Sequence, residues 1–122
     1  MYSITIILRF CAAHKIDGYN GKCANLHGHN YKLELEVSAT QLDKLGFVVD
    51  SDIIKQHVKP IIAQLDHQYL NELPGFAGVS PSAENIAKYI YEQCDQSLRK
   101  DRIQISQVTL WETDDFYVRY RK

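Results

Sequence analysis

The chain has 122 residues, of which 45% are hydrophobic and 24% charged, and its formal net charge is −1. This length suits one domain spanning residues 1–122, and the near-neutral charge gives no support for a nucleic-acid partner or a membrane surface, which would need clustered lysines and arginines. The apolar run at residues 4–8 is too short for a signal peptide or membrane span, and three cysteines form no disulfide framework, so we expect a cytoplasmic protein with reduced thiols.

Two segments in the first third of the chain alternate apolar and polar residues, which is the period of a half-buried strand. In residues 2–10 the apolar even positions share one face, and the same parity extended onward includes His14. In residues 31–37 the apolar odd positions share one face, and that parity extended backward includes His27 and His29. If the two strands pair as a hairpin, three imidazoles lie at neighbouring ends of one buried face.

Three histidines with a fourth position left open are typical of catalytic zinc, whereas a structural site closes all four positions, usually with several cysteines. We therefore favour a metal site over three unrelated histidines. Residues 15–22 have the glycines and asparagine of a loop, which would carry Cys23 near the metal. Cys23 could be a fourth, closing ligand. We favour the alternative, a free thiolate beside the metal, where it makes a good base.

A first helix is predicted after Asp50 or Ser51, either of which is a plausible N-cap, and Pro60 inside it predicts a kink or a break. The helix is expected to run into the segment that contains Asp66 and His67. Neighbouring side chains face apart on a regular helix. The pair can therefore take part in catalysis only if both side chains turn toward a third group such as the Cys23 thiol. The alternative is a capping role at the helix end. The apolar positions at helical spacing are Ile54, Val58, Ile61, Ile62 and Leu65.

A second helix is predicted after Ser80 and Ser82, which are cap candidates, with Glu84 in its first turn, where the helix dipole favours an acid. Cys94 falls on its apolar face and is expected to be a core residue. Two strands close the chain, and a bulge near residues 106–107 would place Glu112 on the buried side, where it would need a partner; the alternative is a glutamate turned to solvent. This order of elements predicts an α+β fold, with a four-stranded antiparallel sheet and two helices on one face.

Five short motifs together carry a resemblance to a known family. In order and over almost the whole chain, they resemble the successive motifs of the 6-pyruvoyl-tetrahydropterin synthase superfamily. This resemblance implies the tunnelling fold, in which ββααββ subunits form barrel-like trimers that stack into a homohexamer with active sites at subunit interfaces. The motifs are Phe10-Cys11-Ala12-Ala13-His14, Cys23-x3-His27-Gly28-His29, Leu65-Asp66-His67-x2-Leu70-Asn71, Glu84-Asn85-x-Ala87 and Glu112-Thr113.

The interval between Cys23 and His27 separates branches of the family. The three residues found here resemble the bacterial 6-carboxy-tetrahydropterin synthases of queuosine biosynthesis, whereas pyruvoyl synthases typically have five. The resemblance therefore implies conversion of 7,8-dihydroneopterin triphosphate to 6-carboxy-5,6,7,8-tetrahydropterin with loss of acetaldehyde and triphosphate. The alternatives are a 6-pyruvoyl-tetrahydropterin synthase, a lyase of related pterins such as sepiapterin, and a non-catalytic pterin- or zinc-binding module.

The resemblance also implies roles for individual residues. Zn²⁺, held by three histidines, would act as a Lewis acid on the hydroxylated side chain of the pterin. Cys23 would be the base, and Asp66 and His67, in this family often from an adjacent subunit, would set its protonation. Glu112 would anchor the pterin by accepting hydrogen bonds from its ring N–H and amino groups. The metal ligands would be His14, His27 and His29, and Glu84 and Ser82 would line the same pocket.

Overall fold

Alternating apolar residues in the first third of the chain produce two long strands. In the computed structural model, which describes residues 1–122, β1 (Tyr2–His14) and β2 (His27–Ala39) pair antiparallel along their full lengths of 13 residues. Their register runs from Tyr2 opposite Ala39 to His14 opposite His27, as the predicted hairpin requires. The helix-facing side of β2 is closed to solvent, since Leu33 and Leu35 are each 0% exposed.

Three further strands complete one sheet in the order β3-β1-β2-β4-β5. The pairs β2–β4 (Ile103–Thr113) and β4–β5 (Phe116–Tyr120) are antiparallel, whereas β3 (Gln68–Tyr69) runs parallel to β1. The α+β fold is as predicted. The prediction of a four-stranded, purely antiparallel sheet is wrong, because the short parallel strand β3 is a fifth member of the sheet. The chain after the first helix returns along the open edge of β1 and pairs with Ala12 and Ala13, whose backbone groups would otherwise lack partners.

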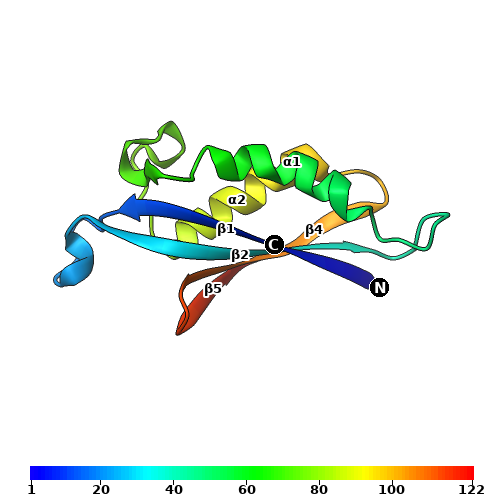
Figure 1. Ribbon diagram of the computed structural model, residues 1–122, viewed down its shortest axis with the longest axis horizontal. Helices are drawn as coiled ribbons and strands as arrows, with labels where there is room; N and C mark the ends of the chain where they lie inside the picture. Colours follow the sequence, from blue (N-terminus) through cyan, green and yellow to red (C-terminus); the bar gives the residue numbers. More distant parts are fainter.

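Both helices lie on one face of the sheet (Figure 1). They are α1 (Ser51–Ala63) and α2 (Ala83–Leu98), and short 3-10 turns lie at η1 (Lys22–Ala24), η2 (Leu70–Glu72) and η3 (Pro74–Phe76). The N-caps agree with the sequence, because the Asp50 side chain accepts from the Asp52 N–H and the Ser82 hydroxyl accepts from the Asn85 N–H. No helix is long and apolar enough to cross a membrane.

The first helix departs from prediction in two ways. The predicted break at Pro60 does not occur, because Pro60 lies in the last turn, where only one intrahelical hydrogen bond is lost; the alternative, a kink, stays a prediction. The helix also ends at Ala63, with Gln64 as its C-cap, earlier than expected. Asp66 and His67 therefore lie in the turn after the helix, and His67 has a positive φ of 58°. The rule that neighbouring helical side chains face apart does not apply to them.

The apolar faces of both helices pack on the sheet as one hydrophobic core. Cys94 is 0% exposed, and burial raises the pKa of its thiol to about 12. It is a core residue, as predicted. The other helical members of the core include Ile54, Val58, Ile62, Ile86, Ala87 and Ile90.

Two bulges interrupt β4. At the first, Glu36 pairs with Gln107 and Val37 pairs with Ile105, so Ser106 is the extra residue, at the position predicted from parity. At the second, Trp111 pairs with Tyr117 and Thr113 pairs with Phe116. The residue left over there is Glu112, so the bulge sets the position of a carboxylate singled out by the sequence.

Candidate active site

Three histidine side chains converge where β1 ends and β2 begins. His14 is the last residue of β1 and lies directly opposite His27, while His29 follows two residues along β2 on the same face. One ring nitrogen from each lies within 4.8 Å of the others, and His14 is 1% exposed. The prediction that these three imidazoles meet on one buried face is confirmed.

Hydrogen bonds on the outer side of two rings fix how they are protonated. His14 Nδ1 lies 2.7 Å from the carbonyl oxygen of Pro81, and His27 Nδ1 lies 2.7 Å from that of Asn25. A carbonyl oxygen can only accept, so each Nδ1 donates its N–H to that carbonyl and Nε2 is the nitrogen left for another partner. The two Nε2 atoms lie 3.0 Å apart. At that distance they can share a proton or ligate the same metal ion.

The third ring leaves its nitrogen free. His29 Nε2 is buried and has no hydrogen-bond partner, and its nearest acid is Oε1 of Glu112 at 3.4 Å. Burial, followed by the neighbouring His14 and His27, lowers the pKa of His29 to about 4, so its ring is neutral near pH 7. A buried neutral imidazole nitrogen without a partner is available to ligate a metal.

This donor set fits a divalent metal of the zinc type. Zn–N bonds of about 2.0–2.1 Å place neighbouring ligand atoms of a tetrahedral site about 3.3 Å apart, close to the separation of the His14 and His27 nitrogens. Ligating histidines usually donate their other N–H to a carboxylate or a backbone carbonyl, as the Pro81 and Asn25 carbonyls allow here. Three protein ligands leave a position open, which is the arrangement of catalytic rather than structural zinc.

Glu112 lies beside the histidines because of the second bulge in β4. Its side chain is 13% exposed, so it is an inward carboxylate rather than one turned to solvent. Burial raises the pKa of Glu112 and the nearby negative charge of Glu84 adds to that shift, while His14 and His27 act in the opposite direction. A buried acid on the open side of a metal cluster is positioned to accept hydrogen bonds from a bound ligand.

The start of α2 approaches the cluster through its backbone. Pro81 gives its carbonyl to His14, while the Ser82 hydroxyl caps the helix by accepting from the Asn85 N–H at 3.2 Å. The Glu84 side chain is exposed. Its connection to the site is electrostatic, since its negative charge contributes to raising the pKa of Glu112. The Ser82 hydroxyl uses an acceptor position as the cap and keeps its O–H to donate, so the predicted pocket roles of Ser82 and Glu84 stay predictions.

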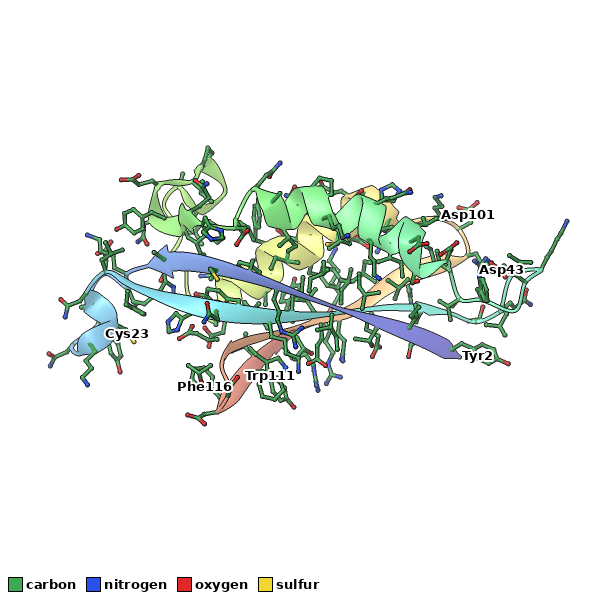
Figure 2. All side chains as sticks on the ribbon, viewed as in Figure 1. Tyr2, Cys23, Asp43, Asp101, Trp111 and Phe116 are labelled. Carbon is green, nitrogen blue, oxygen red and sulfur yellow. The ribbon has the colours of Figure 1, made fainter.

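Cys23 lies in η1, in the loop that joins β1 to β2, and is half-buried. Figure 2 shows it at the end of the molecule where this loop projects beyond the sheet. Its carbonyl oxygen accepts from the Ile16 N–H at 2.7 Å, which ties the loop back to a residue just past His14. The Cys23 sulfur is not part of the cluster of ligand atoms, so the structure leaves the metal site open rather than closed by a thiolate.

Asp66 and His67 contact each other directly, which corrects the expectation that they face apart. His67 Nδ1 lies 3.0 Å from Asp66 Oδ1, and the same oxygen accepts from the Cys11 N–H at 2.9 Å. The Cys11 hydrogen bond is the main reason that the pKa of Asp66 is lowered, so it stays ionised. His67 is 78% exposed and makes no hydrogen bond to Cys23 within the chain. One chain therefore forms the acid–imidazole pair but not the full relay.

Some site residues were missed from the sequence. Backbone acceptors such as the Asn25 and Pro81 carbonyls have no sequence signature. Tyr31 could have been found, since it shares the odd face of β2 with His27 and His29. Its hydroxyl lies 3.5 Å from His14 Nδ1, and burial, followed by the charge of Glu112, raises its pKa.

Comparisons with known proteins identify the family of the chain. Residues 3–122 match the family described as 6-pyruvoyl tetrahydropterin synthase. The chain is similar to a 6-carboxy-5,6,7,8-tetrahydropterin synthase of Haemophilus influenzae, with 31% identity and full coverage of both chains. It is also similar to a 6-pyruvoyl tetrahydrobiopterin synthase of Dictyostelium discoideum, with 34% identity over 83% of this chain and 74% of that protein.

A solved structure supports the fold. The 6-pyruvoyl tetrahydropterin synthase of Caenorhabditis elegans superposes with a TM-score of 0.89 over 99% of this chain and 95% of that chain, at 24% identity. The arrangement of strands and helices is therefore that of the tunnelling fold, even where the sequences differ at three positions in four.

Removing one imidazole should abolish tight metal binding without unfolding the chain. We expect His29→Ala to weaken the affinity for Zn²⁺ by about 100-fold or more, since it deletes a ligand and not merely its support. Competition with a chromophoric chelator measures the affinity. The matched control is His57→Ala on α1, whose ring contacts the Ser97 hydroxyl and no other histidine. Equal affinities for the two variants would contradict the site.

Proposed function

Because the chain belongs to the 6-pyruvoyl tetrahydropterin synthase family, we propose that it is a zinc-dependent carbon–carbon lyase acting on 7,8-dihydroneopterin triphosphate. With one water, this substrate gives 6-carboxy-5,6,7,8-tetrahydropterin, acetaldehyde and triphosphate. The proposal places the enzyme in queuosine biosynthesis, in the cytoplasm, as a homohexamer built from two trimers.

One observation carries this proposal. The Nε2 atoms of His14 and His27 lie 3.0 Å apart beside the unpartnered Nε2 of His29, an arrangement that suits a shared metal ion, and an inward carboxylate lies next to it. A pterin offers adjacent ring N–H and amino donors for that carboxylate and hydroxyls for an open metal position. The three-residue interval between Cys23 and His27 and the relative from H. influenzae favour the carboxy branch.

Each residue of the proposed site then has a role in binding or catalysis. His14, His27 and His29 would hold zinc, which when bound supplies a Lewis acid for the side-chain hydroxyls. Glu112 would bind the pterin ring. Its raised pKa reflects burial without enough donors, and the pterin N–H groups would stabilise its ionised form. Such an anchor is selective, because a ligand without these donors leaves the acid unpaired.

Cys23 would take and return the side-chain protons of the substrate. Its loop is fixed beside His14 through Ile16, so the thiol can reach a substrate held by the histidines without belonging to the metal site. The Asp66–His67 pair is exposed and preformed, which suits a pair that receives the Cys23 loop of an adjacent subunit. In that arrangement the imidazole accepts the thiol proton and the Asp66 carboxylate stabilises the charged ring.

A second candidate is the related triphosphate lyase that forms 6-pyruvoyl-tetrahydropterin. The observation in its favour is the similarity to the D. discoideum protein, which bears the name of that activity. The two reactions share the substrate and differ in whether a carbon–carbon bond is cleaved, so the products distinguish them.

The decisive experiment is a product assay. Purified, zinc-loaded protein is given 7,8-dihydroneopterin triphosphate, and the products are identified by mass spectrometry together with an enzymatic test for acetaldehyde. We expect acetaldehyde and 6-carboxy-5,6,7,8-tetrahydropterin in equal amounts. A 6-pyruvoyl product without acetaldehyde would assign the chain to the second candidate, and absence of turnover by zinc-loaded protein would rule out both.

Replacing Cys23 separates an enzyme from a structural zinc module. We expect Cys23→Ala to lower kcat by about 10²–10⁴-fold, the usual loss on removing a general base, with zinc content and pterin binding unchanged. The control is Asn20→Ala, which changes an exposed residue of the same loop. Loss of zinc from Cys23→Ala would instead indicate a closed, structural metal site.

Replacing one carboxylate oxygen of Glu112 by the NH2 group of an amide tests whether Glu112 anchors the pterin. Because Glu112→Gln offers a donor where the ring needs an acceptor, the Kd for the pterin should rise by about 10–100-fold, while zinc content is retained. Equilibrium binding followed by pterin fluorescence measures the change. Glu72→Gln, which changes an exposed acid in η2, serves as control and should change the Kd by less than about threefold. Similar effects of the two substitutions would argue against the anchor.

A further inference from the structure

A cavity lies at the end of the sheet opposite the histidines. Its volume is about 440 Å³, within the range of small-molecule sites. It is lined by the end of β2, the start of β4 and the α2–β4 connection, and Figure 2 shows Tyr2 and Asp101 at this end, with Cys23 at the other. Because β1 has 13 residues at about 3.3 Å per residue, the two ends are roughly 40 Å apart, so one pterin cannot reach both.

The lining of this cavity is positively charged. Arg99, Lys100 and Arg102 line it, against a single acid, Asp101. Arg99 is paired with Asp95, but neither Lys100 nor Arg102 has a carboxylate within ion-pair distance. Asp43 is near enough for the charge of Arg102 to contribute to lowering its pKa, but it does not line the cavity. The lining itself has more cations than acids, and such a concave surface attracts an anion.

Arg102 is also held rigidly. Its Nη1 donates to the Gln41 carbonyl at 2.9 Å and its Nη2 donates to the Val48 carbonyl at 2.6 Å. Carbonyl oxygens orient the guanidinium without neutralising its charge. A preorganised positive group loses little conformational entropy when an anion binds.

A buried hydroxyl supplies an independent sign of a ligand. Ser38 lines the cavity, is 1% exposed, and its Oγ has no hydrogen-bond partner. Its strand neighbours are Ser3 on β1 and Gln104 on β4, so backbone pairing does not engage the side chain. Buried polar groups are nearly always hydrogen-bonded, and an exception next to unpaired cations calls for an acceptor.

A purely structural role would explain the positive side chains of this cavity but not its unpartnered hydroxyl. Positive side chains after a helix stabilise the negative end of its dipole, and Arg99 is the C-cap of α2. This does not account for the unpartnered Ser38 hydroxyl on β2. We propose that the cavity is a second anion site, for a multivalent phosphate-class oxyanion, with Lys100 and Arg102 as charge partners and Ser38 as a hydrogen-bond donor.

Calorimetric titration of the assembled, zinc-loaded protein with inorganic triphosphate tests this site. We expect saturable binding that weakens as salt rises. Lys100→Gln should raise the Kd about tenfold, the usual loss for a charge-assisted hydrogen bond, and Ser38→Ala should raise it at least about threefold. The matched control is Lys59→Gln, which removes an exposed lysine from α1 and should leave the Kd within about twofold.

The ligand-free proteins give a second measurement. If Ser38 awaits an anion, Ser38→Ala removes an unsatisfied buried hydroxyl, so its Tm without triphosphate should equal or exceed that of the unsubstituted protein, while its affinity falls. Repeating the titration with ATP shows whether the site recognises phosphate alone or a phosphorylated small molecule, since the latter would bind more tightly.

Several results would overturn the proposal. They are an absence of binding, a Lys100→Gln variant that binds as tightly as Lys59→Gln, and a Ser38→Ala variant with unchanged affinity. Triphosphate binding that survives both cavity substitutions would belong to the histidine end of the molecule. None of these outcomes depends on pterin turnover. The proposed anion site and the proposed lyase reaction are therefore tested independently of each other.

Discussion

The register of β1 against β2 determines whether the histidine cluster exists. His14 belongs to one strand and His27 and His29 to the other, and they share a face because His14 pairs directly with His27. A slip of one residue that turned the side chains of β2 to the opposite face would bury charges such as Lys32 and Glu34 and expose Leu33. The apolar alternation along both strands therefore selects the register. Packing of the core in this way also determines where the three histidines lie.

The same placement makes the cluster electrostatically incomplete without a cation. Carbonyls behind His14 and His27 leave both Nε2 atoms for another partner, and burial keeps His29 neutral beside Glu112. Without a metal, the chain holds a buried His29 nitrogen that has no partner and a carboxylate whose ionisation is disfavoured by burial. Metal binding relieves this cost, so the free energies of folding and of metal binding are coupled. The hydrogen bond from His14 to Pro81 extends the coupling to the start of α2.

Sequence patterns were sufficient where period and parity decide the outcome. They located the histidines on one face and a bulge near Ser106, and they included Asp50 and Ser82 among the cap candidates, because each depends on a side-chain type at a fixed spacing. They did not locate β3 or the contact between Asp66 and His67. Both depend on where α1 stops, and the chain ends it at Ala63 although apolar residues at helical spacing continue to Leu65. The second bulge, which orients Glu112, has no sequence signature either.

The arrangement of backbone edges suggests why the chemistry would be divided among chains. β3 covers β1 only at Ala12 and Ala13, so residues 2–10 leave one edge of the sheet open, and β5 leaves the other. Open edges at both sides allow strands of identical chains to pair into a closed barrel, which removes exposed edges. Cys23 lacks a partner in its own chain, and the ionised Asp66 with its exposed His67 lies at the β1 edge. Pairing through the edges would bring such a dyad toward a neighbouring loop, so closure of the sheet and completion of the proposed relay would be the same event.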